Sequence, residues 1–146
     1  MKDIDEAITK LKQRYTDAVS ARNAKALVQL YDPKARIFDT WGVWEYTATD
    51  SWQLAIEGWL SSRPGDKLRV SFNDCVVWGG MELATMTAIV TYAGISPDGT
   101  ESQSMQNRLS WTVKTIGHNL RIIHEHTSVP IGFENMTAIL KRNVQP

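Results

Sequence analysis

The chain has 146 residues, with 16 lysines and arginines against 16 aspartates and glutamates, and we expect it to form one domain over residues 1–146. The zero net charge argues against a nucleic-acid partner, because such proteins usually carry a basic face. No apolar run approaches the roughly 18 residues of a membrane span, and the acidic start and single Cys75 favour a cytoplasmic protein without membrane contact.

The first segment predicts two helices. Apolar residues recur there at spacings of three and four: Ile4, Ile8, Leu11, Tyr15, Ala18 and Val19. The pattern breaks at Arg22-Asn23, and Asn23 is the expected N-cap of a short second helix that Asp32-Pro33 ends. The buried candidates of this second helix are Leu27, Val28, Leu30 and Tyr31.

A short strand, a loop and a third helix are expected next. Ala35–Thr40 reads as the strand and Trp41–Tyr46 as a polar and aromatic loop. Asp50, followed three residues later by Gln53, matches a capping box for the third helix. Its apolar stripe would be Trp52, Ala55, Ile56, Trp59 and Leu60, and Pro64-Gly65 ends it.

The rest of the chain alternates with period two, which is typical of half-buried strands. The predicted strands are Lys67–Trp78, Glu82–Ala93, Ser102–Lys114 and Leu120–Ser128, separated by turns that are rich in glycine. Phe133, Met136, Ile139 and Leu140 suggest a short final helix. Segregated helices beside an antiparallel meander indicate an α+β fold.

Tyr15 and Asp39 are the first candidate site residues. Tyr15 lies on the buried helix stripe, where its hydroxyl is either a donor to a developing oxyanion or a core group bonded to the backbone. Asp39 lies near the end of the first strand. In an apolar mouth it would be a general base with a raised pKa, and otherwise it is an exposed strand-end residue or turn cap.

Three further candidates lie on the later strands. Asn107 interrupts an apolar face, where its amide would orient a ligand or satisfy the backbone at a bulge. Strict alternation puts His124 and His126 on the inner face with Leu120 and Ile122, and it puts Glu125 outside. Two histidines without a third ligand make a weak metal site, so we expect pocket-lining or core histidines and no metal.

Two stretches carry a resemblance to the nuclear transport factor 2-like superfamily. The first, QRYTDAVSARNAKALVQLYDPKARIFDT (Gln13–Thr40), resembles the N-terminal segment of ketosteroid isomerases. The second, LRIIHEHTSVP (Leu120–Pro130), is similar to the ending of SnoaL-like members. Together with the order of elements, the resemblance extends over essentially the whole chain.

This resemblance implies a cone-shaped half-barrel, in which a curved antiparallel sheet wraps around N-terminal helices. It also implies that Tyr15 corresponds to the oxyanion tyrosine of ketosteroid isomerase and Asp39 to its catalytic base, without any cofactor. The second acid of that enzyme has no counterpart around Asn107.

Two functions remain open from the sequence. In the first, an isomerase-, cyclase- or dehydratase-like enzyme, Asp39 removes a proton beside a carbonyl. Tyr15 and Asn107 hold the enolate there, and His124 or His126 shuttles the proton. The second is a non-catalytic binding or oligomerisation module that resembles the association domain of calcium/calmodulin-dependent protein kinase II. In either case the outer sheet face would form a homodimer through its mixed surface: Thr85, Thr87, Ile89, Thr91, Arg108 and Ile123.

Six tryptophans against three phenylalanines are unusual, and tryptophan is favoured where an apolar wall also needs a polar handle. We expect most of them to line the cavity or its entrance. The predicted ligand-contacting set, besides Asn107, is Trp41, Trp44, Trp59, Trp111 and Met86. Such a lining favours a small, hydrophobic, flat or polycyclic ligand.

Overall fold

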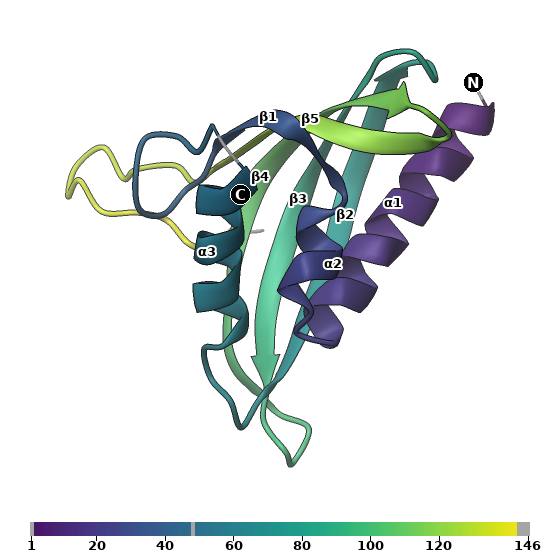
Figure 1. Cartoon of the computed structure of the whole chain (residues 1–146). Coiled ribbons are helices and arrows are strands. Elements are labelled where there is room, and N and C mark those ends of the chain that lie inside the picture. The colour runs from purple at the N-terminus through teal and green to yellow at the C-terminus, as the bar shows by residue number, and fades with distance from the viewer. Residues whose placement is uncertain (1, 48, 143–146) are drawn as a thin grey trace.

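The helices and strands follow the predicted order. The computed structural model describes residues 2–47 and 49–142, and within them the helices are α1 (Lys2–Ser20), α2 (Ala24–Val28) and α3 (Thr49–Leu60). The strands are β1 (Tyr31–Phe38), β2 (Lys67–Gly79), β3 (Ala84–Ile95), β4 (Glu101–Ile116) and β5 (Asn119–Ser128). Figure 1 shows the helices on one face of a curved, unclosed sheet that tapers toward the turn between β3 and β4. The α+β cone is therefore confirmed.

The sheet has the order β1-β5-β4-β3-β2, and its last four strands form the predicted antiparallel meander. β1 pairs with β5 in parallel, whereas the sequence predicted an antiparallel sheet throughout. It also begins at Tyr31, earlier than expected, because Tyr31 pairs with Ile122 and the Leu30 carbonyl accepts a hydrogen bond from the Ile122 amide at 2.9 Å. Pro33 is tolerated within β1 because this is an edge strand.

The helices bury the apolar stripes that the sequence predicts. The α1 stripe from Ile4 to Val19 is buried in the core, where each large side chain contributes roughly 1.5–3 kcal/mol. Asn23 caps α2 as predicted, since its Oδ1 accepts a hydrogen bond from the Ala26 amide at 3.0 Å. The third helix begins at Thr49, one residue before the expected cap Asp50, and Gln53 donates to Glu57. Among the described residues, no helix is both long and apolar enough to span a membrane.

The predicted final helix is wrong. Residues 129–142 form an irregular hairpin instead, closed by a bridge between Ile131 and Ala138 and by hydrogen bonds of the Gly132 amide to Thr137 and the Ile139 amide to Pro130. Phe133 is 94% exposed and Met136 is 76% exposed. A short amphipathic helix forms only where its apolar stripe finds a surface to cover, and this segment extends away from the wide end of the cone (Figure 1).

β5 contains a bulge that decides which of its side chains point inward. Thr112 of β4 pairs with His124 and the next residue, Val113, pairs with Ile122, so Ile123 is an extra residue without a partner. A bulge of this kind shifts the alternation of faces by one position. Leu120 and Ile122 therefore point inward before the bulge, and Glu125 and Thr127 point inward after it.

Candidate functional site

A pocket of about 460 Å³ lies between α3 and the sheet. α3 packs against α2 and β1, and its inner stripe, which includes Trp52 and Trp59, forms one wall of the pocket. The rings of these two tryptophans contact Tyr46 and Tyr92, at centroid distances of 5.0 and 5.3 Å. The pocket thus has flat aromatic walls, as binding sites for hydrophobic ligands commonly do.

Asp39 lies half-buried at the wide end of this pocket, directly after β1. Its carboxylate accepts hydrogen bonds from the Trp41 amide and the Thr127 hydroxyl, both at 3.2 Å. Thr127 also accepts hydrogen bonds from the Thr40 amide and hydroxyl, so it joins β5 to the start of the loop. Burial raises the pKa of Asp39 above its ordinary value, and the hydrogen bonds from Trp41 and Thr127 oppose this shift.

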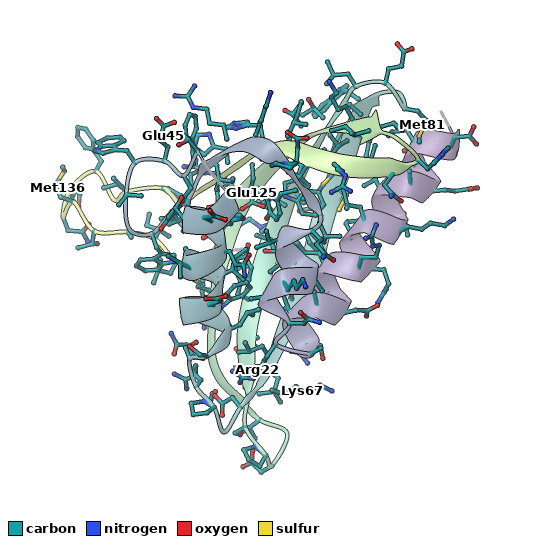
Figure 2. All side chains as sticks on the ribbon, in the orientation of Figure 1. Arg22, Glu45, Lys67, Met81, Glu125 and Met136 are labelled. Atoms are coloured by element: carbon teal, nitrogen blue, oxygen red, sulfur yellow. The ribbon has the colours of Figure 1, made fainter. Side chains whose placement is uncertain are left out.

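Glu125 is a second carboxyl group at the pocket, and only 2% of its surface is exposed. Figure 2 shows it in the interior of the molecule, enclosed between the sheet and the helices. Its Oε1 accepts hydrogen bonds from the Tyr31 hydroxyl at 2.5 Å and from the Trp111 indole nitrogen at 2.9 Å. Burial raises the pKa of Glu125 to about 7 despite these two donors, and the charge of Asp39 adds to the rise.

Two tyrosine hydroxyls complete the polar lining near the acids. Tyr15 and Tyr92 both line the pocket, and the Tyr15 ring packs against Phe72 and Trp111 at 5.7 Å each. Burial, reinforced by the charge of Glu125, raises the pKa of both tyrosines far above the ordinary value. Both phenols are therefore neutral hydrogen-bond donors over the whole physiological pH range.

Asn107 reaches the pocket from β4 and is 4% exposed. Its Oδ1 is buried without a hydrogen-bond partner among the described residues. An unpaired buried polar atom destabilises a fold by roughly 1–3 kcal/mol. A ligand that supplies a donor would remove this penalty, so Asn107 offers a polar anchor inside the pocket.

The prediction for the two β5 histidines is wrong in its geometry. The bulge at Ile123 turns His124 and His126 to the outer face, where both rings contact Phe38, at 5.0 and 5.4 Å. The Nδ1 of His124 donates to the Arg36 carbonyl at 2.7 Å. Neither histidine lines the pocket.

Three of the predicted ligand contacts also lie elsewhere. Trp44 is 96% exposed, because the bridge between Ile37 and Tyr46 closes the loop and leaves its tip projecting outward. Met86 and Trp111 are completely buried in the core and do not line the pocket. Trp41 and Trp59 do line it, together with Asp39, Tyr15 and Asn107.

Glu125 is the site residue that sequence reasoning missed. Strict alternation along β5 puts it outside, and only the bulge puts it inside. The available signal was the apolar pair Ile122-Ile123, which breaks the period of two at the position where the extra residue sits. Within the described ranges no three His, Cys, Asp or Glu side chains gather to hold a metal ion.

Comparisons with known proteins agree with this fold. A family model described as a SnoaL-like domain matches residues 8–132. Among curated proteins no significant match was found. A solved NTF2-like protein of unknown function from Pseudomonas putida KT2440 has a TM-score of 0.85 at 20% identity, with 98% of each chain covered.

Two solved Streptomyces structures are also similar. Aln2 from a Streptomyces species has a TM-score of 0.78 at 11% identity and covers 88% of this chain and 91% of its own. ActVI-ORFA from Streptomyces coelicolor has a TM-score of 0.77 at 7% identity, with 86% and 96% covered. At these identities the likeness demonstrates the shared fold alone.

Proposed function

The chain belongs to the SnoaL-like domain family, and on this premise we propose that it is an acid–base enzyme of the isomerase, cyclase or dehydratase kind. Its substrate would be a hydrophobic carbonyl compound with fused or flat rings. The observation that carries the proposal is the pair of carboxyl groups, Asp39 and Glu125, that face one aromatic pocket with raised pKa values. Two titratable groups in different environments within one pocket are the usual basis of divided acid and base roles.

Asp39 is the proposed general base. It is more exposed than Glu125, and its charge contributes to the raised pKa of Glu125, so Asp39 ionises first. It removes a proton from the carbon beside the substrate carbonyl. The electron pair of that C–H bond forms a carbon–carbon double bond, and the π pair of the carbonyl moves onto its oxygen. A carboxylate with a raised pKa is a stronger base than an exposed one.

Glu125 and Tyr15 are the proposed donors to the developing enolate oxygen. With a pKa of about 7, Glu125 is protonated in about half of the molecules at neutral pH, and its Oε1 is already occupied by Tyr31 and Trp111. The remaining oxygen would then carry the proton toward the pocket. Glu125 thereby supplies from β5 the second acid that the resemblance to ketosteroid isomerase had left without a counterpart.

A non-catalytic ligand-binding module is the second candidate, and Asn107 is the observation that favours it. Its unpartnered Oδ1 needs a donor from a ligand whether or not a reaction follows. Such a module would bind the same class of hydrophobic molecule and release it unchanged. Turnover therefore separates the two candidates, whereas binding does not.

The test is proton exchange in 2-tetralone, a bicyclic ketone with acidic protons beside its carbonyl, followed by NMR in D₂O. We expect the wild-type protein to accelerate exchange over buffer, and we expect Asp39→Asn to lower the accelerated rate at least about 100-fold, because a positioned base contributes 10²–10⁴-fold. The melting temperature should stay nearly unchanged, because the amide keeps the shape of the carboxylate.

The exposed Asp3→Asn is the matched control, since Asp3 does not line the pocket and should leave the rate unchanged. An Asp39→Asn protein that exchanges at the wild-type rate would contradict the enzyme proposal. Binding of 2-tetralone without any acceleration of exchange would favour the binding module.

A further inference from the structure

The two ends of the pocket differ in charge. At the wide end, the charged residues that line the pocket are two carboxyls: Asp39, which follows β1, and Glu125 of β5. The cations Arg63 and Arg69 belong to the turn after α3 and to the start of β2. We propose that the narrow end is a subsite for a carboxylate group of the ligand and that Arg63 is its main specificity-determining residue, an inference that rests on the proposed function of the pocket.

Arg63 is held in a fixed orientation at this end. Its Nε donates to Asp66 at 2.9 Å, one terminal nitrogen to Gln103 at 2.5 Å and the other to Ser102 at 3.2 Å. A guanidinium has five N–H donors, so two remain for a ligand. Because its side chain is already ordered by three partners, Arg63 loses little further conformational freedom when an anion binds.

Arg22 fixes the turn that carries Arg63. Its guanidinium donates to the carbonyls of Leu60, Ser62, Arg63 and Asp66, at distances from 2.5 to 2.8 Å. These carbonyls lie at and beyond the C-terminal end of α3, where the helix itself supplies no donors. Figure 2 shows Arg22 and Lys67 near the narrow tip of the cone. The turn is therefore clamped by a single side chain from the segment between α1 and α2.

Gly94 makes room for this arrangement. A Cβ at Gly94 would lie 2.9 Å from the Asp66 carboxylate, 3.0 Å from the Ser102 hydroxyl and 3.2 Å from the Nε of Arg63. The absence of a side chain lets this cluster pack directly on the backbone of β3. Hydrogen bonds from Ser102 and Arg63 also keep the pKa of Asp66 low, so Asp66 remains the ionised partner that orients Arg63.

The length of the pocket sets the shape of the ligand. α3 rises about 12 Å from Trp52 to its last residue, Leu60, and Ser62 and Arg63 follow directly. The carbonyl that reacts at the acids and the carboxylate that binds Arg63 must then lie roughly 10 Å or more apart. A fused bicyclic ring system with a short acidic side chain meets this requirement, whereas a neutral polycycle leaves the two free N–H donors of Arg63 unused.

The experiment compares 4-(6-hydroxynaphthalen-2-yl)butanoate with its primary amide, which has the same shape without the charge, by isothermal titration calorimetry. The wild-type protein should bind the acid at least about tenfold more tightly, because charge-assisted bonds to arginine are the stronger kind. In Arg63→Gln the preference for the acid over the amide should fall below about threefold, and Arg63→Lys should keep part of it.

A second measurement needs no variant. Raising the salt from 50 to 500 mM should weaken binding of the acid to the wild-type protein and leave the amide unaffected, because only the charged pair is screened. Equal affinities for acid and amide would overturn the subsite and leave the pocket function standing. A preference that survives in Arg63→Gln would overturn the role of Arg63. Failure of both probes to bind would contradict the proposed binding pocket as well.

Discussion

At the scale of single residues, Glu125 is a buried carboxyl that accepts hydrogen bonds from two neighbouring side chains. Glu125 is almost fully buried, and its two donors, Tyr31 and Trp111, come from β1 and β4 on either side of β5. Burial still outweighs these hydrogen bonds and holds the pKa at about 7. A group so perturbed beside a ligand pocket is typical of a functional position, and it also makes stability depend on pH.

We expect the free energy of unfolding to fall as pH rises through the titration of Glu125. The folded pKa of about 7 lies above the ordinary value of 4.5, so the contribution is complete below about pH 4.5 and is lost as pH rises through 7. At up to about 1.4 kcal/mol per pH unit, the loss is roughly 3 kcal/mol. Urea unfolding of the wild type and of Glu125→Gln at pH 5 and pH 8 measures this loss. Asp39 is present in both proteins, so its own titration contributes to both free energies of unfolding.

The variant cannot titrate at position 125, so the difference between the two proteins should shift in favour of Glu125→Gln as pH rises. Glu82→Gln changes an exposed side chain and serves as the control, with a pH dependence equal to that of the wild type. A wild-type minus Glu125→Gln difference that is constant from pH 5 to pH 8 would contradict the buried acid.

At the scale of elements, the turn between β2 and β3 contains two consecutive glycines, Gly79 and Gly80, and only the first position requires glycine. Gly79 has a φ of +105°, and a Cβ there would lie 2.4 Å from the Leu83 carbonyl oxygen and 2.8 Å from the Cα of Ala84. Both the backbone conformation and the lack of space thus require glycine. A Cβ at Gly80 would have open space within 4 Å, and Gly80 has no positive φ.

The two glycines form a matched pair for mutation. Gly79→Ala should lower the free energy of unfolding by about 2–4 kcal/mol, because the strained φ and the backbone clash add together. Gly80→Ala should leave it unchanged or raise it by up to about 1 kcal/mol, because alanine restricts the unfolded chain. Chemical denaturation of both variants measures their free energies of unfolding. Similar free energies for the two variants would contradict the prediction, because they would show that the turn relaxes around either side chain.

At the scale of the whole molecule, one face of the sheet has no helix on it, since Figure 1 shows all three helices on the other face. The centre of β3 on this outer side carries Thr85, Thr87, Ile89 and Thr91, all half-buried. Arg108 of β4 lies beside Ile89 and donates to Ser128. We propose that this mixed surface forms a homodimer, because non-obligate interfaces have a similar balance of polar and apolar area.

Ile89→Lys should therefore convert a dimer into a monomer, since it puts a charge at the centre of the proposed interface without touching the core. Leu54→Lys is the control, because Leu54 is an exposed apolar residue of α3 on the opposite side, and this variant should remain dimeric. Light scattering at about 100 μM reports the mass of each protein. A monomeric wild type, or a dimeric Ile89→Lys, would contradict the proposed interface.

The chain's local patterns determined much of this structure without tertiary information. The helical stripe of α1 and the alternating faces of β3 and β4 follow from the periods of helix and strand, and the Asn23 cap follows from the residue type at the helix start. These features depend on side chains that lie within a few residues of one another, so the order of residues specifies them. The same patterns made Tyr15, Asp39 and Asn107 candidates with a structural alternative left open for each, and all three line the pocket.

Only the tertiary structure decided the rest. One unpaired residue, Ile123, brings Glu125 into the pocket and turns His124 and His126 out of it, because a bulge depends on how β4 and β5 pair and not on β5 alone. The apolar C-terminal segment forms no helix because the fold leaves no core surface for it to cover. A period of two or 3.6 assigns each side chain to a face, but pairing between distant strands decides where that period breaks.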